Sequence, residues 1–419
     1  MTEVRPEGQR TTRLSGFVII LIATGIAGVA SYAVTILVPN CVGLAGYSVF
    51  AVFWSSIYLV VGALGGIQQE VTRATQPLPV GVPTQKSRAR NFAVFTGAAV
   101  FVAVLATAPL WARAVFPSEG WNLVWPLAVG TASFVVVAVL GGSLYGVAAW
   151  VPLALMISVD ALLRLSTLSI TLLFTTDVVA LAWAVALPFP LTIGVLWPVI
   201  RRSIAGRTRL DVGCGALAWN VARTVVAATA TGIMVSGFPL LLGLTSHSQP
   251  ADTLGVYIAT ITLTRAPLIV IALSLQSYLV VHFRDNTEHF WRQFLRLIGI
   301  VIASGTVLAG AGWLLGPSVY HLLFPSGNPD GPFFAILVGS SALVAALCIS
   351  AAAVLARSQH FVYSVGWVAA AVVTVIALLL PAGFTARTLI ALICGPIVGL
   401  LFHAGYFAFA RILEKRQSR

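Results

Sequence analysis

The stretch GYSVFAVFWSSIYLVVGALGGIQQEVTRA, residues 46–74, begins with a run free of charged side chains (Gly46–Ile67) and ends in glutamine, glutamate and arginine. An α-helix needs about 20 largely apolar residues to cross the hydrocarbon core of a membrane. The run is long enough for one crossing. The stretch is therefore predicted to be a transmembrane helix whose polar end lies at a membrane surface.

The composition of the whole chain extends this prediction. Of its 419 residues, 59% are hydrophobic and only 9% are charged, whereas a soluble domain carries about 25% charged residues. The formal charge of +12 is expected to reflect membrane orientation, because basic residues gather on the cytoplasmic side of membrane proteins. Nucleic-acid binding is therefore not expected. The four cysteines are scattered (Cys41, Cys214, Cys348 and Cys394), and no disulfide framework, metal site or cofactor is predicted.

Twelve apolar segments are long enough to cross a membrane, and turn residues separate several of them, as in VPN at 38–40, FPSEG at 116–120 and PAG at 381–383. The chain is predicted to be an all-α integral membrane protein with about twelve transmembrane helices. The predicted spans are Leu14–Val38, Gly46–Ile67, Phe92–Trp111, Leu123–Leu144, Trp150–Phe174, Val178–Ile200, Ala218–Leu242, Gly255–Val281, Leu297–Leu315, Pro332–Leu355, Phe361–Leu380 and Leu389–Phe409.

The positions of lysine and arginine predict the orientation of these spans. With the N-terminus in the cytoplasm, all but five of the 24 basic residues fall on the cytoplasmic side. Arg113 and Arg387 fall outside, and Arg164, Arg223 and Arg265 lie within spans. We therefore expect a multi-pass protein of the bacterial inner (plasma) membrane with both termini cytoplasmic. The polar N-terminus does not resemble a signal peptide, so the first span is expected to be retained.

Three short matches indicate an internal duplication. ATGI at 23–26 recurs at 230–233, Tyr47 is matched by Tyr257, and FPS at 116–118 recurs at 324–326. All three fall near one register, at corresponding places among the spans. The chain is therefore predicted to consist of two parallel six-helix halves, 1–210 and 211–419. Parallel repeats of this kind commonly rock against each other and bind substrate near the bilayer midplane.

Charged groups inside a membrane are costly and mark functional sites. Arg265 lies near the middle of its span and is followed by Pro267, so we expect it to line a wet cavity or bind an anion. Arg223 lies nearer the cytoplasmic surface, where it either extends to that surface or joins the same site. Asp160 and Arg164 are spaced i,i+4 and can pair on one helix face. That pair is either structural or couples transport to a proton or cation.

Gln69, Glu70 and Arg73 form the polar end of the opening stretch. Glu70 and Arg73 can pair at i,i+3. This end is either a plain helix terminus or a cytoplasmic gate. The chain contains no nucleophile triad, phosphate-binding loop or cluster with metal-ligand spacing, so it is not expected to be an enzyme.

Several of these stretches resemble a known family. GLAGYSVFA (43–51) with the glycine-rich end and Arg73, and GGSLYGVAAW (141–150) followed by DALLRL (160–165), resemble the Wzx-type polysaccharide-lipid flippases of the multidrug/oligosaccharidyl-lipid/polysaccharide (MOP) exporter superfamily. The resemblance implies alternating access around a cationic cavity lined by spans one, two, seven and eight. It also implies that a polyprenyl-phosphate- or pyrophosphate-linked saccharide is flipped to the outer leaflet for cell-envelope polysaccharide synthesis. Arg223 and Arg265 fall on spans seven and eight, and would bind the phosphate.

The partners that the resemblance implies are the lipid-linked sugar, membrane lipids and glycosyltransferases of the same pathway. The protein itself is expected to be a monomer.

Three alternative functions stay open at this point. A drug or small-cation exporter of the same superfamily would need acidic residues in its cavity. A major-facilitator transporter would carry a basic signature between spans two and three, which residues 69–90 lack. A membrane glycosyltransferase would carry acidic catalytic residues in large external loops, whereas the external loops here are short.

Overall fold

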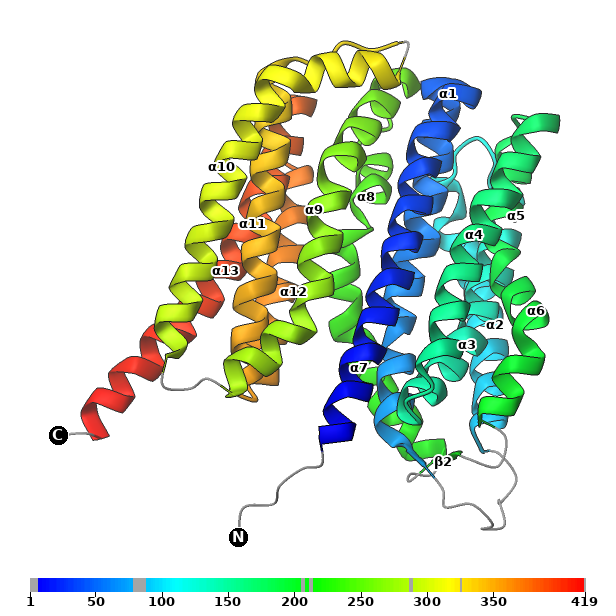
Figure 1. Ribbon diagram of the computed structural model, residues 1–419. Coiled ribbons are helices and arrows are strands. Elements are labelled where there is room, and N and C mark those ends of the chain that lie inside the picture. The colour runs from blue at the N-terminus through cyan, green and yellow to red at the C-terminus, as the bar shows by residue number, and fades with distance from the viewer. Residues whose placement is uncertain are drawn as a thin grey trace, which may run out of the picture. The chain divides into compact units, whose positions relative to one another are not determined.

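A computed structural model of the protein describes residues 7–77, 88–204, 208–210, 214–285, 289–324 and 326–417 (Figure 1). Within these residues the chain forms thirteen helices and two short strands. Their bounds are α1 (Glu7–Ala74), β1 (Thr75–Pro77), α2 (Arg88–Val115), α3 (Trp121–Gly146), α4 (Trp150–Phe174), α5 (Val178–Ala186), α6 (Pro188–Ile204), β2 (Thr208–Leu210), α7 (Cys214–Val235), α8 (Phe238–Thr245), α9 (Ala251–Asp285), α10 (Phe290–Leu323), α11 (Gly331–Ala356), α12 (His360–Leu378) and α13 (Phe384–Gln417).

The predicted fold class is confirmed, and the chain is an all-α, multi-pass membrane protein. The first two predicted spans share α1, the sixth lies on α5 and α6, the seventh on α7 and α8, and the others lie on one helix each. Among the described residues nine helices are apolar and long enough to cross a membrane, or ten with the bent pair α7–α8. One of the nine is the 57-residue segment Val18–Ala74, which at 1.5 Å per residue extends over roughly 85 Å and is long enough for two crossings.

The predicted break at VPN (38–40) is wrong. Helix α1 continues through Pro39, and its non-helical residue is Gly43, with φ 73° and ψ 168°. A proline removes only one backbone donor and can be accommodated in a long membrane helix. A positive φ is readily adopted only by glycine, which is why the two spans separate at Gly43.

Two further helix breaks were not predicted. The sixth predicted span is divided at Leu187, before Pro188 begins α6. The seventh is divided at Ser236 and Gly237, where α7 and α8 meet at a bend of 73°. Non-helical backbone at membrane depth occurs where protein or a water-filled cavity surrounds it. The second break is therefore a candidate place for a site.

The chain divides into two compact units. Unit 1 contains Met1–Leu37 and Val52–Thr229, and unit 2 contains Val38–Ala51 and Ala230–Arg419. The middle of α1 thus packs within unit 2, and the first part of α7 packs within unit 1. The division of the sequence into halves at residue 210 stays a prediction, because contacts do not report ancestry.

The helices repeat at one offset. Helix α11 begins and ends 210 residues after α3, and α12 begins 210 residues after α4. Two non-glycine residues have a positive φ in the described chain, Ala148 at 54° and Ser358 at 60°, again 210 residues apart. Each lies in the tight turn between the repeated helices. Because a positive φ is uncommon for such residues, the shared turn supports the internal duplication.

The start of α1, the turn between α3 and α4, and the strands β1 and β2 lie close together in unit 1. A Cβ at Gly16 would lie 2.6 Å from the Trp150 side chain, and one at Gly146 would lie 2.5 Å from Thr75. Thr75 in turn pairs with Leu210 across the antiparallel strands β1 and β2. These ends are the ones assigned to the cytoplasm by charge, and their orientation in the membrane stays a prediction.

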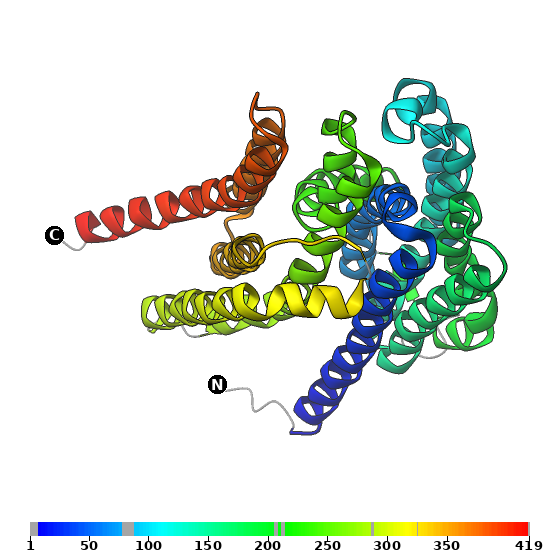
Figure 2. The same ribbon diagram turned by 90° about the horizontal axis from the view of Figure 1, so that it is seen from above.

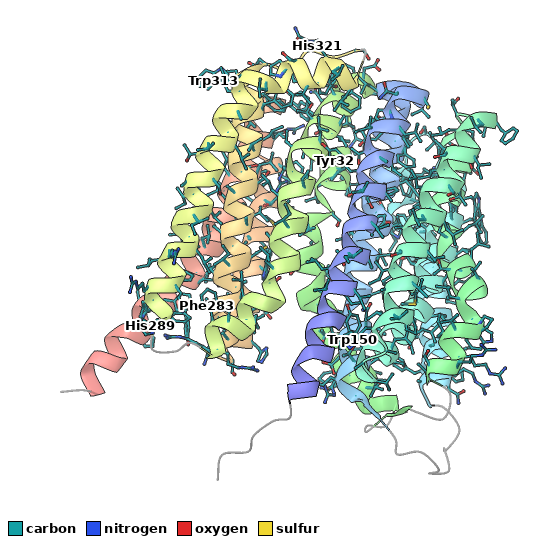
Figure 3. All side chains as sticks on the ribbon, viewed as in Figure 1. Tyr32, Trp150, Phe283, His289, Trp313 and His321 are labelled. Atoms are coloured by element: carbon teal, nitrogen blue, oxygen red, sulfur yellow. The ribbon has the colours of Figure 1, made fainter. Side chains whose placement is uncertain are left out.

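Aromatic side chains lie at both ends of unit 2. Figure 3 shows Phe283 and His289 at one end of this unit and Trp313 and His321 at the other. The first pair lies where α9 ends and α10 begins, on the side assigned to the cytoplasm, and the second pair lies near the opposite end of α10. Aromatic residues at both ends are typical of helices that cross a membrane.

Candidate functional site: a buried arginine beside a broken helix

Arg265 is buried in unit 2. The arginine is 4% exposed, and its guanidinium carbon lies 5.6 Å from the centre of the Phe238 ring. Within the described part of the chain, its Nε atom has no hydrogen-bond partner. The cation–π contact with Phe238 is weak compensation for a desolvated charge. Arg265 is therefore a buried cation suited to an anionic ligand.

The threonine hydroxyls next to Arg265 on α9 are already hydrogen-bonded. The Thr262 hydroxyl donates to the carbonyl of Ile258 at 2.8 Å, and the Thr264 hydroxyl donates to the carbonyl of Thr260 at 2.8 Å. These bonds satisfy the two hydroxyls within their own helix. Neither hydroxyl therefore needs a ligand, in contrast to the Nε atom of Arg265.

The broken helix lies next to Arg265. Phe238 is the first residue of α8, directly after the α7–α8 break. At that break the amides of Ser236 and Gly237 both donate to the carbonyl of Gly232. The last carbonyls of a helix lack partners within it and carry a partial negative charge. The sequence SGFP (236–239) carries the signal for this break, but Phe238 was not singled out by sequence reasoning.

Arg223 is the other arginine predicted to bind the phosphate. Arg223 lies on α7, in the part of that helix that belongs to unit 1. Its side chain is outside the described part of the structure. Its role in binding stays a prediction.

The pair Asp160–Arg164 forms as predicted, within α4 of unit 1. Arg164 donates to both carboxylate oxygens of Asp160, with N–O distances of 2.8 and 3.0 Å. Its Nε atom also donates to the carbonyl of Val185 at 3.4 Å, and its guanidinium carbon lies 4.6 Å from the Phe189 ring centre. Arg164 is 6% exposed. A guanidinium bonded on three sides and covered by a ring has the surroundings of a structural group, in contrast to Arg265.

The predicted gate residues lie where the end of α1 packs against α7. Glu70 accepts a hydrogen bond from Arg73 at 2.9 Å and one from the Thr224 hydroxyl at 3.2 Å. A Cβ at Gly66, one turn earlier, would lie 3.0 Å from the amide nitrogen of Val225. Gln69 is exposed. The Glu70–Arg73 pairing was predicted from its spacing, but the long-range partner Thr224 was not.

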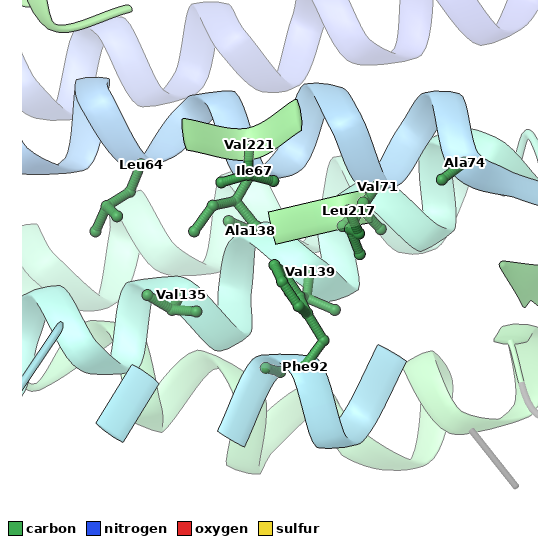
Figure 4. Close-up of a cluster of buried hydrophobic side chains, with 11 residues drawn as sticks. Leu64, Ile67, Val71, Ala74, Phe92, Val135, Ala138, Val139, Leu217 and Val221 are labelled. Carbon is green, nitrogen blue, oxygen red and sulfur yellow. The ribbon is translucent and has the colours of Figure 1, made fainter. Parts of the chain in front are cut away.

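Apolar packing surrounds this polar contact. Figure 4 shows side chains of α1 and α7 in one buried cluster of unit 1, together with residues of α2 and α3. Ile67 and Val71 of α1 are in it, as are Leu217 and Val221 of α7. The strands β1 and β2 continue the contact beyond the helix ends. The first half of α7 is thus fixed to the end of α1 by apolar packing, one polar bond and a strand pair.

The comparisons with solved structures identify the fold. The chain is similar to an inward-facing MATE multidrug transporter of the MOP superfamily, with a TM-score of 0.66, 15% identity and coverage of 94% of this chain and 99% of the other. It is also similar to the lipid II flippase MurJ in its inward closed conformation, with a TM-score of 0.64, 11% identity and coverage of 93% and 87%. The chain therefore has the fold of the MOP superfamily transporters.

A third similar structure is a MOP superfamily transporter from Pyrococcus furiosus, described by the reverse polarity of its binding pocket. Its TM-score is 0.59, with 16% identity and coverage of 94% of this chain and 95% of the other. No protein-family model matches the chain.

Relatives at higher identity come from mycobacteria. The chain is 32% identical over 388 residues to the uncharacterized protein Rv3630 of Mycobacterium tuberculosis, covering 91% of this chain and 89% of that protein. It is 31% identical over 389 residues to the uncharacterized protein Rv1510 of the same species, covering 92% and 90%. The protein belongs to the same family as these mycobacterial proteins.

Proposed function

We propose that the protein is a transporter that flips a polyprenyl-phosphate- or pyrophosphate-linked saccharide from the inner to the outer leaflet of the plasma membrane. The observation that carries this proposal is the buried guanidinium of Arg265, whose Nε atom has no partner in the described chain. Arginine presents a planar fork of donors that suits a phosphate group. A phosphate bound there would compensate the buried charge.

Two further observations support an anionic, lipid-linked cargo. The fold is shared with transporters, among them the lipid II flippase MurJ. The segments 43–51, 141–150 and 160–165 resemble the polysaccharide-lipid flippases. The cargo would serve cell-envelope polysaccharide synthesis, and the partners proposed with it are glycosyltransferases of the same pathway.

The second candidate function is export of drugs or small cations, which the similarity to MATE structures favours. A cation site requires a carboxylate that is free to bind. Asp160 is the acid within the predicted spans, and both of its oxygens are engaged by Arg164. Its pairing favours an anionic cargo over a cationic one.

We propose that the polar end of α1, with Gln69, Glu70 and Arg73, forms one wall of the cytoplasmic gate. In this proposal α7 stays packed on α1 through the buried cluster and the Glu70–Thr224 hydrogen bond when the cytoplasmic side opens. The exposed side chains of Gln69 and Arg73 would then line the mouth.

The proposed function is tested by replacing Arg265 in a strain that depends on the protein. We expect Arg265→Ala to abolish complementation while the protein still accumulates in the membrane, and the lipid-linked saccharide to accumulate in the cytoplasmic leaflet. Arg113→Ala is the matched control, because Arg113 is an exposed arginine outside the site. Normal complementation by Arg265→Ala would contradict the proposal.

A stability measurement separates loss of function from loss of fold. Because Arg265 is buried without a full set of partners, Arg265→Met is expected to leave thermal stability unchanged or to raise it. A large drop in stability would assign Arg265 a structural role instead.

A further inference from the structure

A groove on unit 2 lies outside the site described above. Its walls are formed by α10, with Trp291, Phe294 and Ile298, and by α13, with Leu400, Ala404 and Phe407. Its volume is about 420 Å³, within the range of small-molecule sites. Seen from above, α11 lies between α10 and α13 (Figure 2), and it supplies the floor.

Among the described residues that line the groove, the hydroxyl on its floor is already hydrogen-bonded. Its polar lining residue is Ser350 of α11, whose hydroxyl donates to the carbonyl of Leu347 at 2.9 Å. The same hydroxyl oxygen lies 2.8 Å from Nδ1 of the buried His403. Because this oxygen is engaged on both sides, the groove presents apolar surface and is suited to an alkyl chain.

Basic residues lie at one end of the groove. The guanidinium carbon of Arg357 is 4.4 Å from the ring centre of Phe290 and 5.7 Å from those of Trp291 and Phe407. The last two rings also line the groove. Arg292 and Arg296 are exposed on the first turns of α10. This end is the one assigned to the cytoplasm, where anionic lipids attract basic residues.

The length of the groove matches one leaflet. Its lining residues on α13 run from Leu400 to Ala408, which corresponds to roughly 12 Å of helix. The hydrocarbon core is about 30 Å thick, so the groove extends over less than half of it, beginning at the basic end. A phospholipid acyl chain occupies a single leaflet in this way, whereas a polyprenyl chain is much longer.

We propose that this groove binds one acyl chain of an anionic phospholipid of the cytoplasmic leaflet, with the headgroup phosphate at Arg357. Arg292 and Arg296 add positive charge at the same end. Charge complementarity selects an anionic headgroup, and the apolar walls select its chain. This inference does not depend on the cargo, because it concerns a different surface of the protein.

The test uses the full-length protein purified in detergent and analysed by native mass spectrometry after addition of phosphatidylglycerol or phosphatidylcholine. The wild-type protein is expected to retain one phosphatidylglycerol at least 10-fold more strongly than phosphatidylcholine. Ala404→Trp fills the groove from an exposed position on α13, so it is expected to reduce retention about 10-fold without removing core packing. Ala303→Trp is the matched control, since Ala303 is exposed on α10 and does not line the groove.

A second pair of variants tests the headgroup. Arg357→Gln is expected to abolish the preference for phosphatidylglycerol, and Arg357→Lys is expected to keep it, because lysine retains the charge. Unchanged retention by Ala404→Trp, or equal retention of both lipids by the wild-type protein, would overturn the proposal. So would displacement of the bound lipid by polyprenyl phosphate at equimolar concentration, which would assign the groove to the cargo.

Discussion

Replacing Asp160 should reveal how strongly the α4 ion pair holds unit 1 together. Removal of the carboxylate by Asp160→Ala leaves the buried guanidinium of Arg164 with the Val185 carbonyl at 3.4 Å and the Phe189 ring. Breaking a buried pair by removing one partner costs about 3–5 kcal/mol. The Asp160 side chain is 19% exposed, so water can partly replace it. We therefore expect the lower end of that range, about 3 kcal/mol.

Two further variants test the pair. Arg164→Met should cost less than Asp160→Ala, because the carboxylate that remains is 19% exposed and can be hydrated, whereas the guanidinium is more deeply buried. Asp160→Leu with Arg164→Met should recover most of the loss, because an apolar pair of similar size is often as stable as a buried ion pair. Thermal unfolding of the purified protein, followed by tryptophan fluorescence, measures these differences.

The transport activity of the double variant decides between the two roles of the pair. If the pair is structural, the double variant should fold and transport like the wild-type protein. A double variant that is stable but inactive would refute this reasoning and assign Asp160 to coupling.

Two close helix contacts give further predictions. Gly66→Val should lower the free energy of unfolding by about 1–3 kcal/mol, because a Cβ at Gly66 would lie 3.0 Å from the α7 backbone. Gly65→Val is the control and should be tolerated, since a Cβ there meets nothing within 4 Å. Equal thermal stability of the two variants would contradict the proposed packing. Gly255→Val should disrupt unit 2, because a Cβ at Gly255 would clash with the carbonyl of Leu44. Gly339→Val, where a Cβ meets nothing within 4 Å, is its control, and yields of folded protein after purification compare the pair.

Much of the fold could be predicted from local sequence. Apolar runs predicted the helices, and turn residues at 116–120 and 381–383 predicted breaks that the structure has. The break after the first span was misplaced, because proline at Pro39 looked decisive whereas the chain turns at Gly43. Helix breaks inside apolar runs, at Pro188 and Gly237, were hidden by the continuous hydrophobicity on both sides.

The contacts of the candidate site could also be predicted only in part. Pairs within one helix, Asp160–Arg164 and Glu70–Arg73, follow from spacing alone, because the helix fixes which residues are neighbours. The contact of Glu70 with Thr224 joins residues 154 positions apart, and no local pattern reports it. The basic end of the groove, where Arg357 lies over three aromatic rings, is equally non-local.

The most direct test of the central claim is the affinity of the purified protein for a short-chain polyprenyl phosphate. Loss of hydrogen bonds to a charged group costs about 1.5–3 kcal/mol, so Arg265→Met should bind it roughly 10- to 150-fold more weakly than the wild-type protein. The corresponding polyprenol, which lacks phosphate, should bind both proteins alike. Equal affinity of the two proteins for the phosphate would contradict the assignment of Arg265 to an anionic cargo.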